Sequence, residues 1–162
     1  MGRLQLSLVA APLVFAACAV ATRAPGRRSA AALAGGAAFG LGNVGWDVLA
    51  QAAGWWSYPG AGGSGHGPWL WYAAAGLSGG GVSLIGWRVR RRFGARGALV
   101  FLAGFAVYCA LRDWRVASAP GAVIVFAPGA SPFLADASAA LTLMAVALGL
   151  QLALGGDARS LR

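Results

Sequence analysis

Long apolar stretches recur along the whole chain, and they restrict its possible folds more than any other feature. Five of them are about as long as a helix that crosses a bilayer: residues 4–22, 30–54, 69–87, 97–114 and 132–155. Soluble domains carry about 25% charged residues, whereas this 162-residue chain carries 10% and is 59% hydrophobic. We therefore expect an all-α integral membrane protein, a compact bundle of about five transmembrane helices forming one domain over residues 1–162.

The distribution of positive charge predicts an orientation. All 13 basic residues are arginine, and most lie in short segments between the apolar stretches. The positive-inside rule then gives an outside N-terminus, a cytoplasmic C-terminus and a multi-pass protein of a bacterial-type plasma membrane. The net charge of +9 is explained by this topology, so nucleic acid is not an expected partner. Ten arginines fall on the predicted cytoplasmic side: Arg23, Arg27, Arg28, Arg88, Arg90, Arg91, Arg92, Arg96, Arg159 and Arg162.

The first apolar stretch has two interpretations, a cleaved signal peptide or a retained helix, and its length favours the retained helix. Cys18 and Cys109 fall in predicted spans and are expected to be buried apolar thiols. The sequence has no metal-type cysteine pair, and we expect neither a metal nor a cofactor.

Glycines recur at a spacing of four residues in two of the predicted spans. Gly36 and Gly40 form one such pair, and Gly76 and Gly80 form another. Small residues at this spacing allow helix backbones to approach closely in lipid. We expect these pairs to pack helices within one chain, with a dimer interface as the alternative.

Two segments predicted on the outer side have their own character. Residues 55–72, "WWSYPGAGGSGHGPWLWY", are rich in aromatic residues, and such side chains form belts at the membrane–water interface. Residues 119–132 contain the apolar core "VIVF" between two prolines. That core is too short to span a bilayer, so we expect an interfacial or re-entrant hairpin.

A polar stripe runs along the second predicted span. Asn43, Asp47 and Gln51 are spaced four residues apart, which places them on one face of a helix. A charged side chain at this depth costs roughly 2.5–3.5 kcal/mol on insertion scales. The stripe is therefore expected to face the bundle interior or a wet cavity.

The predicted topology brings other polar residues to the same side. Asp47, Arg112, Asp113 and Asp136 can converge on one outward-facing pocket, with further candidates nearby. Asp47 has two interpretations, an ion pair with Arg112 or a functional acid. Asp136 is a second candidate catalytic residue, and its position near a helix N-terminus, which favours a carboxylate, gives it a structural interpretation as well. The remaining candidates are Tyr108 as a catalytic residue, and Asn43, Gln51, His66, Trp55, Trp56 and Tyr72 as binding residues.

The stretch "WDVLAQAAGWWSYP", Trp46 to Pro59, resembles the Trp-Asp…Gly-x-Trp-x-Tyr/Phe pattern of small membrane lycopene cyclase domains and related carotenoid-biosynthesis proteins. The resemblance implies a helical membrane protein that acts on long isoprenoids by proton-initiated cyclisation, with Asp47 as a candidate acid. In that family a Pro-x-Glu-Glu motif opens the next helix. Here the corresponding place reads "GPWLWY", Gly67 to Tyr72, and the chain contains no glutamate.

Three functions are compatible with these features. The favoured prediction is a non-enzymatic scaffold, assembly factor or subunit of a membrane complex, because glycines and aromatics abound and ionisable groups are few. The first alternative is an isoprenoid- or lipid-modifying enzyme, cyclase- or isomerase-like, with Asp47 as the proton donor. The second alternative is a small transporter. The expected partners are membrane lipids, an isoprenoid or other apolar ligand, and other membrane subunits.

Overall fold

The computed structural model describes residues 3–59 and 66–156, and this part of the chain is almost entirely helical. A short antiparallel pair of strands joins two connecting segments, with Trp56 opposite Phe126 and Ser57 opposite Val125. The elements in chain order are α1 (Arg3–Thr22), α2 (Gly26–Ala52), β1 (Trp56–Ser57), α3 (Trp69–Ala117), β2 (Val125–Phe126) and α4 (Ser131–Gly155).

Helix α3 replaces two of the predicted spans. It runs for 49 residues but is broken at Gly94, whose backbone has φ 70° and ψ −158°. The run Arg88–Arg92, predicted to be a loop, is helical because arginine is a good helix former, and only the glycine provides the left-handed conformation that turns the chain. The predicted spans 69–87 and 97–114 are therefore the two arms of one element, residues 69–93 and 95–117.

The prediction of five membrane helices is confirmed only in part. Within the described residues, α3 and α4 are long and apolar enough to cross a membrane, judged by length and composition. Helix α1 contributes a shorter apolar stretch, Leu6–Thr22. Helix α2 is long enough but consists largely of glycine and alanine, with polar residues at both ends, so its composition is less apolar than we predicted.

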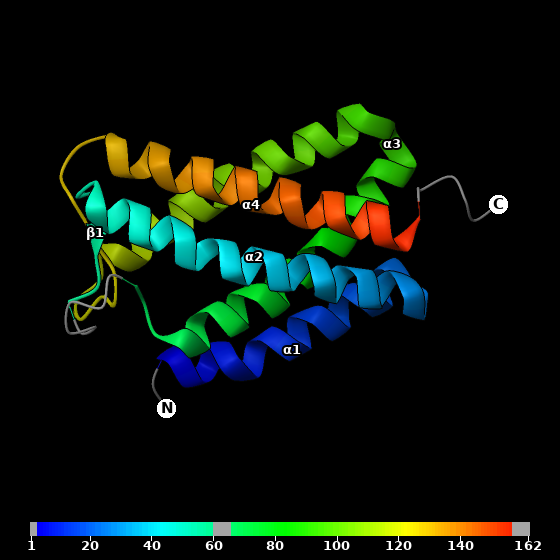
Figure 1. Cartoon of the computed structure of the whole chain (residues 1–162), viewed down its shortest axis with the longest axis horizontal. Coiled ribbons are helices and arrows are strands. Elements are labelled where there is room, and N and C mark those ends of the chain that lie inside the picture. Colours follow the sequence, from blue (N-terminus) through cyan, green and yellow to red (C-terminus); the bar gives the residue numbers. More distant parts are fainter. Residues whose placement is uncertain (1–2, 60–65, 157–162) are drawn as a thin grey trace.

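The helices lie side by side along the long axis of the molecule, with the strands at one end and the Gly94 turn at the other (Figure 1). Helix α2 packs against α3 and α4, and α3 also packs against α1 and α4. We call the two ends the strand end and the Gly94 end. The segment around Val125 pairs with the aromatic segment after α2, so the expected hairpin of residues 119–132 does not pair with itself.

Glycines form the contact between α2 and the first arm of α3. A Cβ atom added at Gly76 would lie 2.8 Å from the backbone oxygen of Gly36, and one added at Gly80 would lie 2.6 Å from that of Ala32. Gly40 has an equally close neighbour on α3. The predicted packing within one chain is therefore confirmed for these glycines, and they are not available for a dimer interface.

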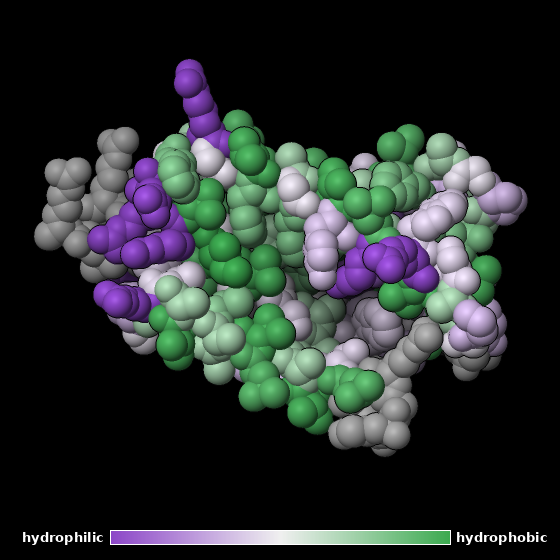
Figure 2. Space-filling model, turned by 180° about the vertical axis from the view of Figure 1, so that it is seen from behind, coloured by the Kyte–Doolittle hydropathy of each residue, from purple (hydrophilic) through white to green (hydrophobic). Residues whose placement is uncertain are grey.

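Much of the outer surface is apolar, while the interior is built largely from small residues. Large hydrophobic side chains such as Val20, Leu41 and Val100 are exposed on three different helices. Figure 2 shows one face covered mainly by hydrophobic side chains, with hydrophilic groups gathered near the Gly94 end and beside a hollow nearer the strands. Exposed apolar surface on this scale is typical of a protein that contacts lipid or another protein.

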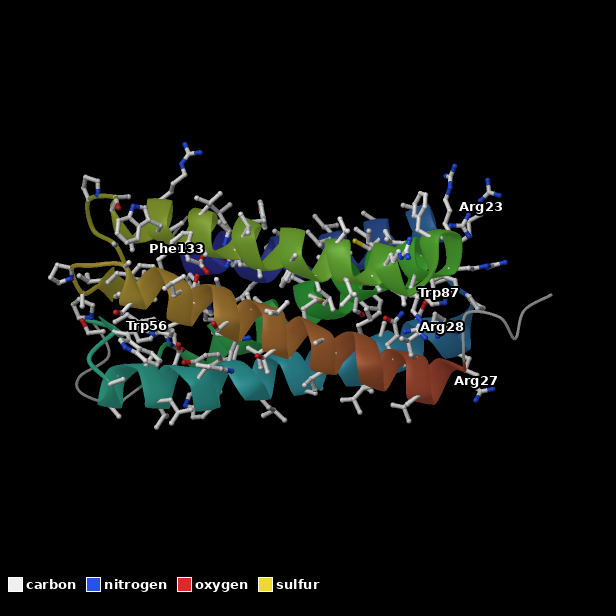
Figure 3. All side chains as sticks on the ribbon, turned by 90° about the horizontal axis from the view of Figure 1, so that it is seen from above. Arg23, Arg27, Arg28, Trp56, Trp87 and Phe133 are labelled. Carbon is white, nitrogen blue, oxygen red and sulfur yellow. The ribbon has the colours of Figure 1, made fainter. Side chains whose placement is uncertain are left out.

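One arginine of the predicted cytoplasmic loops is buried. The guanidinium carbon of Arg28 lies 4.8 Å from the ring centroid of Trp87, and its Nη1 donates a hydrogen bond of 3.4 Å to the backbone oxygen of Gln151. Arg23 and Arg27 from the same loop point away from the helices, as Figure 3 shows. Through these two contacts Arg28, on α2, joins α3 and α4 at the Gly94 end.

Replacing Gly80 by alanine should lower the free energy of unfolding by about 1–3 kcal/mol, because the new methyl group overlaps the backbone of α2. The matched control is Gly104→Ala in the same helix, where the added Cβ would meet open space. That substitution should be neutral or stabilising, by up to about 1 kcal/mol. Thermal unfolding of both variants in one detergent measures the difference, and equal effects would contradict the packing described.

Candidate functional site

Asp47 is a buried hydrogen-bond acceptor shared by three side chains. It lies in the last turns of α2 and is 6% exposed. Trp56 Nε1 donates to its Oδ1 at 3.0 Å, while the hydroxyls of Tyr58 and Tyr72 donate to its Oδ2 at 2.8 Å and 2.5 Å. A carboxylate only accepts hydrogen bonds, so three donors satisfy it well in a buried site.

The local fold explains how these donors reach Asp47. After α2, Gly54 adopts a φ of 70° and turns the chain back, so that Trp56 in β1 and Tyr58 directly after it lie over the helix end. From the other side, the Tyr72 hydroxyl accepts a hydrogen bond of 2.6 Å from the backbone N–H of Gly67. The carboxylate of Asp47 therefore fixes both described ends of the segment that joins α2 to α3.

Burial, and then the neighbouring Asp47 carboxylate, raise the pKa of Tyr58 well above its ordinary value. The phenol consequently stays protonated at neutral pH and keeps donating its hydrogen bond. Trp56 and Tyr72 are also directed inward, at 4% and 5% exposure. These two residues therefore pack inside the protein, away from any belt at a membrane surface.

Of the two interpretations of Asp47, the ion pair with Arg112 is not formed, because each of the two residues has other partners. Arg112 forms a bidentate pair with its own neighbour: Nε lies 2.7 Å from Asp113 Oδ1, and Nη2 lies 2.8 Å from Oδ2. A guanidinium fork matches a carboxylate in this geometry, and the adjacent residue on the same helix end is the nearest acid. The sequence alone could not reveal that three uncharged donors would occupy Asp47.

A cavity of about 470 Å³ lies between the helices in the half of the molecule nearer the strands. All four charged residues that we predicted to converge there do line it, and we call it the aspartate cavity. Its walls come from all four helices and from the segments on either side of the strands. Predicted residues in the lining are Asn43, Asp47, Trp56, Tyr108, Arg112, Asp113 and Asp136.

The aspartate cavity changes from polar to apolar along the bundle. In α2, Phe39 lies two turns further from the strand end than Asp47, a distance of about 12 Å. In the second arm of α3, Phe105 lies about 10 Å further in than Arg112. Val82, from the first arm, also lines the inner part. The charged groups thus lie in the part of the cavity nearer the strands, which we call its mouth, and aromatic and aliphatic groups line the part nearer the Gly94 end, which we call its floor.

Asp136 differs from Asp47 in its surroundings. It lies in the second turn of α4 and lines the cavity, and its Oδ2 atom is shielded from solvent without a hydrogen-bond partner among the described residues. Buried polar atoms are almost always satisfied, so an unpaired carboxyl oxygen in the wall of a cavity is unusual. Among the acids of the cavity, Asp136 is the one with an unused oxygen.

The other predicted residues have more ordinary surroundings. Asn43 Nδ2 donates to the backbone oxygen of Phe39 in its own helix at 2.9 Å. The ring of His66 packs on Trp69 with centroids 4.6 Å apart, and Trp55 packs on Trp56 at 6.5 Å. Gln51, His66 and Trp55 do not line the aspartate cavity. The four-residue spacing correctly placed Asn43 and Asp47 on one face of α2. Gln51, about one turn further along α2, lies outside the cavity lining.

Sequence reasoning missed Tyr58 and Cys109, both of which line the cavity. The sequence did contain a signal for Tyr58, because Gly54, Trp56 and Tyr58 fit the Gly-x-Trp-x-Tyr part of the pattern noted above. Trp56 and Tyr58 both donate hydrogen bonds to Asp47. These shared positions therefore have a structural explanation, the closing of the loop over the helix end. Cys109 gave no signal beyond its position in an apolar stretch.

Comparison of the chain with protein-family models, with curated proteins and with solved structures finds no match. Within the described residues, no group of three or more His, Cys, Asp or Glu side chains is arranged to hold a metal ion. The chemistry of the aspartate cavity therefore has to be argued from its own residues.

Replacing Asp47 by asparagine should lower the free energy of unfolding by about 1–3 kcal/mol, because the amide nitrogen cannot accept a hydrogen bond from one of the three donors. The control is Asp113→Asn, which breaks a partly exposed pair and should cost less than about 1 kcal/mol. Thermal unfolding followed by tryptophan fluorescence compares the two. A larger loss for the Asp113 variant would contradict the role given to Asp47.

Proposed function

We propose that this chain is a multi-pass membrane protein in which α1, α2, both arms of α3, and α4 cross the bilayer. At 1.5 Å per residue, each arm of α3 is long enough to cover about 30 Å of hydrocarbon. The arginines at the Gly94 end support a cytoplasmic position for that end, with the strands, the N-terminus and the aspartate cavity on the outer side of a plasma membrane.

Within this protein, we propose that the aspartate cavity binds an amphiphilic molecule with a long apolar part, such as an isoprenoid or another lipid. The single observation that carries this proposal is the polarity gradient, with charged groups at the mouth and Phe39 and Phe105 at the floor. A cavity of about 470 Å³ falls within the usual range for small-molecule sites.

The charges at the mouth favour a particular kind of head group. Asp47, Asp113 and Asp136 contribute three carboxyl groups there against the single guanidinium of Arg112. A hydroxyl or amine head group can donate hydrogen bonds to these carboxyl groups, whereas a phosphate or diphosphate would meet like charge.

A cavity-filling substitution tests this proposal. Protein purified in mild detergent should carry a co-purified lipid that organic extraction and mass spectrometry detect. Ala75→Phe, in the cavity wall, should reduce the retained amount at least about tenfold, since steric exclusion from a filled site costs more than 1.4 kcal/mol. Ala73→Phe, exposed two residues earlier on the same helix, should leave it unchanged. Equal retention by both variants would contradict binding in this cavity.

A second candidate function is proton-initiated cyclisation or isomerisation of a bound isoprenoid, and Asp136 is the observation that favours it. Both oxygens of Asp47 already accept hydrogen bonds, so the acid role considered for Asp47 passes to Asp136. Its carboxyl would protonate one alkene carbon, a second double bond would close on the cation, and loss of a proton to the carboxylate would restore the acid. Tyr108 and Phe105 line the cavity nearby, and aromatic faces stabilise cations.

Asp136→Asn should abolish such turnover while retaining the co-purified lipid, because the amide keeps the size of the side chain but holds no acidic proton. Product analysis after incubation with an unsaturated isoprenoid measures turnover. Asp113→Asn is the control for removing a carboxylate from the same mouth. Full turnover by the Asp136 variant would exclude Asp136 as the acid, and absence of product with the native chain would exclude this second function without affecting the binding proposal.

The roles of scaffold, assembly factor or membrane subunit remain a prediction, to which the exposed apolar side chains give general support. The role of a small transporter also remains a prediction. A transport path would need polar residues beyond the aspartate cavity. Ser83 and Gln151 are buried polar residues that do not line this cavity, and the Ser83 hydroxyl donates to the backbone oxygen of Gly80.

A further inference from the structure

An open surface groove with a volume of about 540 Å³ lies at the Gly94 end of the bundle. Figure 1 shows the two arms of α3 meeting at this end, away from the strands. The lining comes from the last two turns of the first arm, and we call it the arginine pocket: Arg88, Val89, Arg91, Arg92 and Phe93.

The position of these arginines follows from the end of the helix. The carbonyl groups of a last helical turn carry partial negative charge and favour cations beside them. Gly94 then turns the chain with its φ of 70°, so the side chains of this turn project at the tip of the molecule. The arginine pocket is therefore built into the hairpin of α3.

No described carboxylate neutralises the arginine pocket. Asp47, Asp113 and Asp136 all line the aspartate cavity in the opposite half of the molecule. Figure 3 shows Arg23 and Arg27 at the same end as the buried Trp87, so the loop between α1 and α2 adds further positive charge there. This separation of charge within the described residues leaves the pocket complementary to an external anion.

Two of the guanidinium groups lie over aromatic rings. The guanidinium carbon of Arg91 is 5.9 Å from the centroid of Trp87, and that of Arg92 is 5.4 Å from the centroid of Phe93. When the planar face of a guanidinium packs on an aromatic ring, its N–H groups still point outward in the plane of the guanidinium, where they can donate to the oxygens of a phosphate. The rings thus orient the donors toward an anion.

The apolar part of the pocket indicates what kind of anion it accepts. Val89 and Phe93 lie among the arginines, and Phe93 is 62% exposed despite its charged surroundings. Leu99 and Val100, early in the second arm, are exposed as well. A free phosphate has no apolar part that needs such neighbours, whereas in a phospholipid the phosphate adjoins hydrocarbon chains. Helix α3 is itself long and apolar enough to lie among such chains.

We propose that the arginine pocket binds the phosphate group of an anionic phospholipid. Arg88, Arg91 and Arg92 donate hydrogen bonds to the phosphate oxygens, and Val89 and Phe93 contact the adjoining glycerol and the start of the acyl chains. The pocket is thereby a site for a particular lipid molecule on the predicted cytoplasmic side, distinct in place and in charge from the aspartate cavity.

Lipid retention in native mass spectrometry tests this proposal on the full chain. The protein is delipidated in detergent and titrated with phosphatidylglycerol or with phosphatidylcholine. The native chain should retain phosphatidylglycerol selectively, and Arg91→Gln/Arg92→Gln should weaken that retention about tenfold or more, given about 1 kcal/mol per arginine near a membrane surface. Arg91→Lys/Arg92→Lys should give intermediate retention, because lysine keeps the charge but loses the planar fork.

The matched control is Arg23→Gln/Arg27→Gln, which removes the same charge from the same end but leaves the arginine pocket intact. It should change retention less than about twofold, since these side chains do not line the pocket. Equal losses of retained phosphatidylglycerol in both double variants would show that diffuse positive charge at this end, and not the arginine pocket, holds the lipid. Displacement of phosphatidylglycerol by an equal concentration of inorganic phosphate would overturn the lipid as the occupant, as would equal retention of both lipids.

Discussion

The hydrogen bonds accepted by Asp47 hold together the part of the molecule in which its chemistry is concentrated. A carboxylate in a helix with such an apolar sequence is costly unless it is well paired. That pairing is provided by Trp56 in β1, Tyr58 directly after β1, and Tyr72 in α3. The strand pair and the loop that leads into α3 are fixed by these bonds, and with them the mouth of the aspartate cavity. Asp47 is thus an organising residue, and its neighbour in the cavity, Asp136, has the unused oxygen.

Charge is separated along the bundle. The described acids line one cavity near the strands, whereas the arginine pocket at the Gly94 end is lined by Arg88, Arg91 and Arg92 of α3. Between them, glycines let α2 and α3 approach until backbone atoms touch, so the middle of the bundle is tightly packed. In the orientation that we propose, an amphiphile with a hydroxyl or amine head enters from the outer side, and an anionic lipid is held on the cytoplasmic side.

The sequence predicted the helical fold, the convergence of four charged residues and the role of the glycine pairs, because these depend on periodicity and topology. It did not predict which side chains pair. Arg112 pairs with the adjacent Asp113. Asp47 accepts hydrogen bonds from uncharged donors, two of which are brought to it by the turn at Gly54. Residue spacing in the sequence predicts neither of these pairings. The continuous helix through Arg88–Arg92 was also missed, because charge was taken as a sign of a loop although arginine favours helices.

Access of a small thiol reagent to Cys109 tests most directly whether the aspartate cavity is a binding chamber. Cys109 lines that cavity, whereas Cys18 is packed against Ala32 and Leu84 elsewhere in the bundle. After delipidation, N-ethylmaleimide should modify Cys109, and returning the extracted lipid should slow this modification while leaving the rate at Cys18 unchanged. If the extracted lipid slows neither cysteine, or slows both equally, the cavity is not the site of ligand binding.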